Sequence, residues 1–305
     1  MTTRKAAVAG SFYPRFKPDL LRALEDSFLD KAYGPGELPK LVKTDDRKII
    51  GGISPHAGIR YSGAAAAHTY YNIFKEGVPD TFIILGTDHV GYNKVGLMKN
   101  GTWETPLGEF EIDSELSTKI LTESDLIVED DSAFIGFPFG REHNIEVQLP
   151  FIKYCSDLID KQKQVQIIPI KVAIKNLKNL EKIGSDISRA IEMVGKETVI
   201  IASSDMTHKQ PKNIADPKED LQNMKSKDQA VIDAFNDFDI KKVYANAQKT
   251  SVCGPQTIVT LMFITKNLKA LTTQILKYYT SYDKSTGGQG PCEYSVGYFS
   301  GIITK

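Results

Sequence analysis

Three short apolar runs constrain the fold of this chain most, because a polar segment with a histidine follows each of them. The runs are residues 47–53, 81–85 and 198–202, and the histidines are His56, His89 and His208. Each run is rich in β-branched residues and has the length of a buried strand. Segments of helical character lie between them, and this alternation predicts an α/β fold with parallel strands.

The remaining pattern adds helices and antiparallel strands to this frame. Further helices are expected over residues 113–121, 177–194, 218–235, 240–247 and from about 254 onward. Two late strands, 274–282 and 294–302, flank the turn STGGQG. With no internal repeat and no linker-like segment, the chain is expected to form a single α/β domain, 1–305, with a mixed central sheet flanked by helices.

Four local features carry more specific expectations. Ser62 is suited to cap the alanine-rich helix that follows it. Residues 95–111 alternate and contain Asn-Gly, which predicts a hairpin turn. A helix is expected over 143–155, kinked or split by Pro150. Pro169 indicates that the strand over 165–172 has a bulge or an edge position.

Composition excludes several classes of protein. The 305 residues contain 38 Lys and Arg and 38 Asp and Glu, so the balanced charge does not predict a nucleic-acid partner. Three cysteines without a CxxC pair suit a reducing cytoplasm rather than a disulfide framework. No secretory leader and no apolar window of about 18 residues is found, so a cytoplasmic protein without a membrane span is expected.

The three strand-end histidines are the first sign of a functional site. In open α/β sheets, ligands bind beyond the carboxyl ends of the strands, so His56, His89 and His208 are expected to meet at one edge. Any one of them alone is more simply a turn residue that makes one backbone hydrogen bond. Their shared context favours the site, whereas His68 lies in the middle of a helix and is expected to be structural.

Cys253 precedes Gly254-Pro255 at an expected helix start, where a thiol has a lowered pKa and is more readily a thiolate. The alternative is a small buried hydrophobic residue, a common role for a free cysteine. Two neutral imidazoles and one thiolate would bind Zn(II), Cu or Fe(II) and leave a coordination position open.

Other polar residues are candidates around this centre. Asp205 and His208 in SSDMTH are three residues apart, so Asp205 is expected to support His208 as an acid or base, or else to cap a helix. Arg60 and Tyr61 are candidates for holding an anionic substrate, or are surface residues. His143, at an expected helix start that would lower its pKa, lines the site or caps the helix.

Six blocks of the sequence together resemble one family. They are RKAAVAGSFYP, SPHAGIRYSG, ILGTDH, REHNIEVQLPF, SSDMTH and SVCGPQTI, in this order along nearly the whole chain. They resemble the Memo family, also known as AmmeMemoRadiSam system protein B, which is similar in fold to class III extradiol dioxygenases. The resemblance implies metal binding by His56, His89 and Cys253, and an acid/base role for His208 with Asp205.

The resemblance also limits what is expected of the chemistry. Extradiol dioxygenases complete a non-heme iron site with a carboxylate, whereas Cys253 stands at that position here. A soft thiolate favours copper or zinc and changes iron chemistry, so dioxygenase activity does not carry over. One transition metal ion, Fe(II) or Cu with Zn also suitable, is expected in a redox or other metal-dependent role.

Two further functions and a set of partners follow from the same residues and resemblance. The crevice suits a non-catalytic module that binds a peptide or protein, and a His, His, Cys set with an open position also suits a zinc-dependent hydrolase. The family name implies a pathway shared with a radical-SAM protein and an AMMECR-type protein. A small-molecule or peptide ligand is expected, and neither nucleic acid nor membrane.

Overall fold

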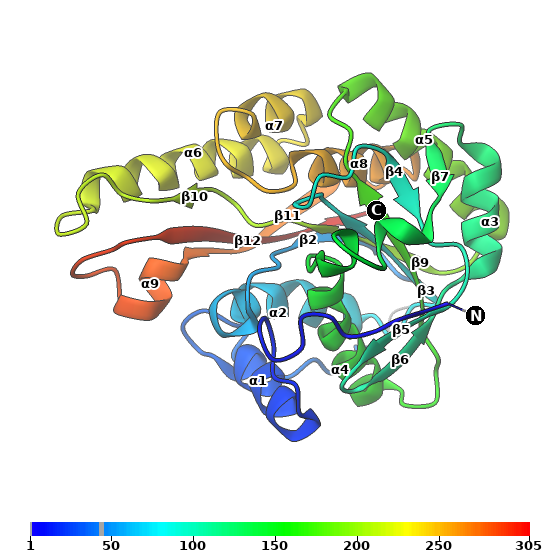
Figure 1. Cartoon of the computed structure of the whole chain (residues 1–305), viewed down its shortest axis with the longest axis horizontal. Coiled ribbons are helices and arrows are strands. Elements are labelled where there is room, and N and C mark those ends of the chain that lie inside the picture. The colour runs from blue at the N-terminus through cyan, green and yellow to red at the C-terminus, as the bar shows by residue number, and fades with distance from the viewer. Residues whose placement is uncertain (1, 43–45) are drawn as a thin grey trace.

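A mixed sheet runs through the centre of the molecule, with helices on both faces (Figure 1). The structure is a computed structural model and describes residues 2–42 and 46–305. Within those residues, the sheet has nine strands in the order β10-β12-β2-β9-β3-β8-β4-β7, with β11 paired to β12 outside this path. The expected α/β fold with a mixed central sheet is confirmed.

The three strands that the sequence predicts are neighbours at the centre of this sheet. They are β2 (Ile49–Ser54), β9 (Thr198–Ser203) and β3 (Thr81–Gly86). All three are parallel, and in register Ala202 pairs with Ile53 on one side and with Leu85 on the other. Their carboxyl ends therefore lie level at one edge of the sheet, as expected from the sequence.

The outer strands make the sheet mixed. β8 is parallel to β3, β4 is antiparallel to β8, and β12 is antiparallel to β2, β10 and β11. Their bounds are β4 (Val95–Leu97), β7 (Ile127–Glu129), β8 (Gln166–Val172), β10 (His208–Lys209), β11 (Thr272–Thr280) and β12 (Ser295–Thr304).

The helices form two layers, each with its own apolar core (Figure 1). One layer consists of α1 (Lys17–Leu29), α2 (Ile59–Lys75) and α4 (Leu149–Ile159). The other consists of α3 (Ser114–Glu123), α5 (Leu177–Val194), α6 (Lys218–Asn236), α7 (Ile240–Ala247) and α8 (Pro255–Asn267). Gly51 in β2 lets α8 approach closely, since a Cβ there would lie 2.5 Å from Leu261 Cδ1.

Local signals place several helix ends correctly. Asp113 caps α3 by accepting a hydrogen bond from Leu116 N at 3.0 Å. The helix expected over 177–194 is observed with those bounds, capped by Asn176 and ended by Gly195 in the left-handed region, φ +72°. The expectation that Ser62 caps a helix is wrong, because α2 begins at Ile59 and Ser62 lies within its first turn.

Two expectations fail because tertiary packing overrides the local pattern. Asn100-Gly101 is not the hairpin turn: the hairpin joins β5 (Thr102–Thr105) to β6 (Gly108–Glu111). β4, which was included in that hairpin, instead joins the main sheet beside β8. β8 itself is an interior strand without a bulge, although the pairing with β4 begins only after Pro169.

Two element boundaries also differ from the sequence analysis. No helix begins at His143: α4 begins at Leu149, and Pro150 lies in its first turn, where the missing N–H costs nothing. The helix is therefore shorter than expected, and Pro150 marks its start rather than a kink or split within it. The late strand ends at Thr280, whose side chain caps the short helix α9 (Ser281–Thr286).

A buried carboxylate fastens the N-terminal segment to the rest of the fold. Glu146 accepts hydrogen bonds from Ala7 N at 3.1 Å, Val8 N at 3.0 Å and the Tyr13 hydroxyl, and pairs with the guanidinium of Arg4. β1 (Thr3–Arg4) then adds to β5 in a small separate sheet.

Within residues 2–42 and 46–305, no helix is long and apolar enough to cross a membrane.

We expect Glu146→Gln to lower the free energy of unfolding by about 3–5 kcal/mol, because the change leaves Arg4 as a buried charge without its partner. Urea unfolding followed by circular dichroism measures this. Glu104→Gln is the matched control, since its partner Lys5 is exposed and surface ion pairs contribute about 0–1 kcal/mol. Equal losses of unfolding free energy in the two variants would show that the buried ion pair contributes no more to stability than the surface pair.

Candidate metal centre

The level ends of β2, β9 and β3 bring the predicted histidines together. His56 follows β2 by two residues and is buried, whereas His89 and His208 are each about a third exposed. The ring centroids of His56 and His89 lie 5.4 Å apart. Donor atoms of His56, His89 and Cys253 all lie within 4.8 Å of one another, so the three residues form one group.

Hydrogen bonds to Ser203 fix the tautomer of His56. The Ser203 hydroxyl donates its only proton to Asn144 O at 2.7 Å, so it must accept from His56 Nδ1, 3.0 Å away. Nδ1 therefore carries the proton, and Nε2 keeps a free lone pair. Nε2 is buried and has no hydrogen-bond partner in the part of the chain that the structure describes. Burial and the nearby His89 lower the pKa of His56 to about 3, which keeps the ring neutral.

His89 is oriented by a carboxylate that the sequence analysis did not select. Glu142 accepts from His89 N at 2.8 Å and from His89 Nδ1 at 3.0 Å, which leaves Nε2 as the free nitrogen of this ring. Burial raises the pKa of Glu142, but the hydrogen bonds and charge of His89 outweigh it and lower the pKa to about 2. Glu142 stands directly before His143 in the REHN block, and this adjacency was the only local signal.

His143 belongs to the same cluster. Its ring centroid lies 5.4 Å from that of His56 and 5.1 Å from that of His89, and its other neighbour is Phe12, stacked at 4.1 Å. Its pKa is lowered to about 3 by burial and by His56. The sequence analysis also expected a lowered pKa for His143, but attributed it to a helix start. That cause is wrong, because His143 lies in a loop before α4.

Cys253 and His208 form the opposite side of the group. Cys253 Sγ lies 3.1 Å from His208 Nε2, and His208 Nδ1 lies 2.7 Å from the Tyr294 hydroxyl. Burial and the negative Asp205 raise the pKa of the Cys253 thiol, so the thiolate expected from the helix start is wrong for the metal-free protein. Burial raises the pKa of the thiol more than the positive N-terminal end of α8, which begins two residues later, lowers it.

Asp205 ties two strand ends together instead of capping a helix. Its carboxylate accepts from His56 N at 2.8 Å and Ala57 N at 3.3 Å, and its Oδ2 lies 4.0 Å from His208 Nε2. The structure continues from Asp205 into β10, so the helix-cap alternative is excluded. Asp205 is therefore placed to orient the loop of His56 and to influence His208.

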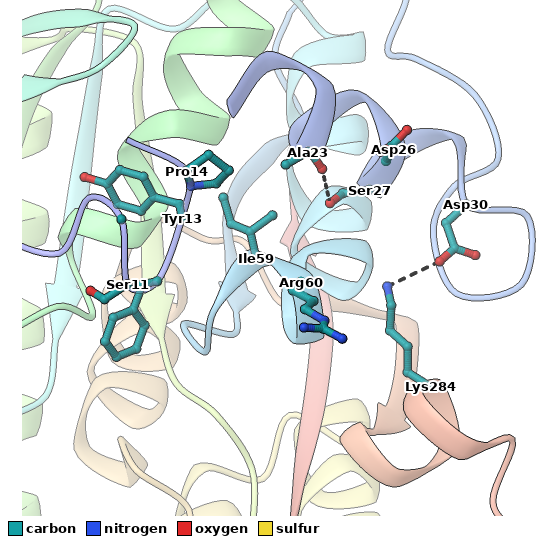
Figure 2. Close-up of a pocket in the computed structure, with 12 residues that line it drawn as sticks. Ser11, Tyr13, Pro14, Ala23, Asp26, Ser27, Asp30, Ile59, Arg60 and Lys284 are labelled. Atoms are coloured by element: carbon teal, nitrogen blue, oxygen red, sulfur yellow. Dashed lines mark hydrogen bonds and ion pairs between the residues drawn. The ribbon is translucent and has the colours of Figure 1, made fainter. Parts of the chain in front are cut away.

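Arg60 and Tyr61 lie in the first turn of α2 and do not join the histidines. The Tyr61 side chain is exposed, and Arg60 lines a separate hollow together with Phe12 and Ile59 (Figure 2). His68, the remaining histidine, donates a hydrogen bond from Nε2 to Tyr33 O at 3.1 Å, as a structural residue does.

We expect the metal-free protein to lose stability as the pH falls from about 6.5 to about 3. His143 in the unfolded chain takes up a proton near its ordinary pKa of 6.5, whereas the folded protein resists protonation down to about 3. The unfolded state thus binds more protons in this window. Urea unfolding at several pH values gives the slope of the unfolding free energy against pH. We expect His143→Asn to reduce this slope by about 1.4 kcal/mol per pH unit. An unchanged slope would show that His143 is not the group that resists protonation.

Comparisons with known proteins agree with the six sequence blocks. The model of the family described as Memo-like protein matches residues 4–302. A MEMO1 family protein of Desulfurococcus amylolyticus is 36% identical over 301 residues, covering 98% of each chain. A MEMO1 family protein of Methanothermobacter thermautotrophicus is 35% identical over 283 residues, covering 92% of this chain and 94% of the relative.

Among solved structures, an uncharacterized protein from Escherichia coli K12 aligns with a TM-score of 0.44 and 10% identity, covering 74% of this chain and 86% of that one. The family match extends over almost the whole chain, and the relatives match over almost their whole length. The chain therefore belongs to the Memo family.

Proposed function

We propose that this protein binds one transition metal ion through His56, His89 and Cys253 and serves a metal-dependent, oxidoreductase-type function. The observation that carries the proposal is His56 Nε2, a buried nitrogen with a free lone pair and no partner within residues 2–42 and 46–305. A buried polar atom of this kind costs free energy unless something binds it. A metal ion is the partner that the neighbouring donors fit.

The donor set suits such an ion. His56 and His89 each engage Nδ1 in a hydrogen bond, so each offers Nε2, the arrangement that metal-binding histidines normally show. Cys253 supplies sulfur within 4.8 Å of both. Two nitrogens and one sulfur suit Fe(II), Cu or Zn and leave one position open for a substrate or water. When bound, the metal would supply redox or Lewis-acid chemistry at that position.

The remaining residues are placed to handle protons. His208 Nε2, 3.1 Å from Cys253 Sγ, is placed to take the thiol proton, because the raised pKa of Cys253 keeps it protonated in the metal-free protein. Tyr294, more than half exposed, connects His208 Nδ1 to solvent. Asp205 lies close enough to stabilise the charged form of His208. His208 is thus the proposed acid or base, and Asp205 its support.

The first test is metal stoichiometry. Purified protein, stripped with a chelator and dialysed against Cu, Fe(II) or Zn, should bind about one equivalent by elemental analysis, and His56→Ala should lose it. His68→Ala is the matched control, because His68 lies in α2 away from the cluster. Retention of a full equivalent by His56→Ala would refute the assignment, and the preferred ion separates a redox role from zinc-dependent hydrolysis.

The second test addresses Glu142. Glu142→Gln keeps the size of the side chain but removes the carboxylate that orients His89, so metal affinity should fall by about 10–100-fold while stoichiometry stays near one. Competition with a chromogenic chelator measures the affinity. Glu129→Gln, an exposed glutamate beside Lys99, should leave affinity unchanged. Equal affinities of wild type and Glu142→Gln would show that Glu142 does not support the site.

A further inference from the structure

Of the three candidate metal ligands, Cys253 does not follow a strand. His56 and His89 come just after β2 and β3, whereas Cys253 lies in the loop between α7 and α8. The register of the sheet therefore places the two histidines but not the sulfur. Other contacts must hold Cys253 beside the imidazoles.

Hydrogen bonds hold the backbone of Cys253 from two sides. Its N–H donates to Asp205 O at 3.2 Å, just beyond the end of β9. Its carbonyl accepts from the Thr87 hydroxyl at 3.0 Å, and Thr87 directly follows β3. Because β9 and β3 are neighbours in the sheet, both polar groups of the Cys253 backbone are bound to the edge from which the histidines emerge.

The direction of the hydrogen bond from Thr87 is fixed by Gln256. Val172 O can only accept, so the amide nitrogen of Gln256 must face it, at 3.2 Å. The same nitrogen donates to Thr87 Oγ1, which leaves the single proton of that hydroxyl for Cys253 O. Thr87 and Gln256 are both buried, so water does not compete for these bonds.

A second path leads from Thr87 to His56 through Asn144. Asn144 Nδ2 donates to Thr87 O at 2.8 Å, and Asn144 O accepts from the Ser203 hydroxyl at 2.7 Å. That hydroxyl accepts from His56 Nδ1 at 3.0 Å. All four side chains are buried, so one internal network connects Thr87 to the ring of a candidate ligand.

We propose that Thr87 positions Cys253 relative to the two histidines, so that the sulfur and the imidazoles can bind the same ion. Thr87 lies two residues before His89, bonds to Cys253 directly and reaches His56 through the network. This inference rests on the proposed metal binding. Valine has nearly the shape of threonine but no hydroxyl, so Thr87→Val removes the hydrogen bond to Cys253 O and largely keeps the packing.

The test uses stripped full-length protein reloaded with Zn(II) or Co(II). We expect Thr87→Val to bind Zn(II) about tenfold more weakly, as variants of residues that orient metal ligands do. The thiolate-to-Co(II) charge-transfer absorption should also weaken, because Cys253 is no longer held. Thr87→Ser keeps the hydroxyl and should retain both properties. Thr265→Val is the matched control, since Thr265 is buried in α8 and its hydroxyl also donates to a backbone carbonyl, that of Met262.

The outcomes separate this inference from the proposed function. Absence of metal binding by the wild type would overturn both. Metal binding by the wild type, with equal affinity and equal absorption in Thr87→Val, would overturn this inference alone, and so would equal losses in Thr265→Val. Circular dichroism identifies a variant that does not fold. If Thr87→Val does not fold, Gln256→Met, which removes the amide that orients the hydroxyl, should weaken the absorption, and an unchanged absorption would overturn the inference.

Discussion

The parallel pairing of β2, β9 and β3 is the constraint on which the candidate site depends. Ile53, Ala202 and Leu85 lie at one level across the three strands, so the chain leaves all three at the same edge. A shift by one residue would turn each side chain to the other face of the sheet. The buried apolar residues on both faces of these strands prevent such a shift and thereby fix where the histidines emerge.

Buried carboxylates then convert this common edge into defined geometry. Asp205 holds the backbone of the His56 loop, Glu142 holds both the backbone and the ring of His89, and Glu146 holds the N-terminal segment that carries Phe12. Each carboxylate accepts at least two hydrogen bonds, which offsets the cost of burying its charge. Few residues would contact the metal, but the residues that position them come from distant parts of the chain.

Electrostatics inside the cluster keep His56 and His143 neutral and the Cys253 thiol protonated, whereas Glu142 raises the pKa of His89. His56 and His143 are too buried and too close to each other to charge together, and Cys253 lies near the negative Asp205. A bound cation would reverse the balance at Cys253 by favouring the thiolate. The same burial leaves His56 Nε2 without a hydrogen-bond partner among residues 2–42 and 46–305, as expected of a nitrogen that awaits a ligand.

The sequence by itself determined the α/β class, the central strands and the strand-end candidates, because β-branched runs and helical periodicity are local properties. It also identified the family, since six motifs in order are specific. Tertiary structure alone decided that Glu142 orients His89, that His143 lies in the cluster and that Cys253 is protonated without metal. It also decided that Arg60 faces another hollow. Hydrogen-bond partners and desolvation depend on residues far apart in the chain, so no local pattern encodes them.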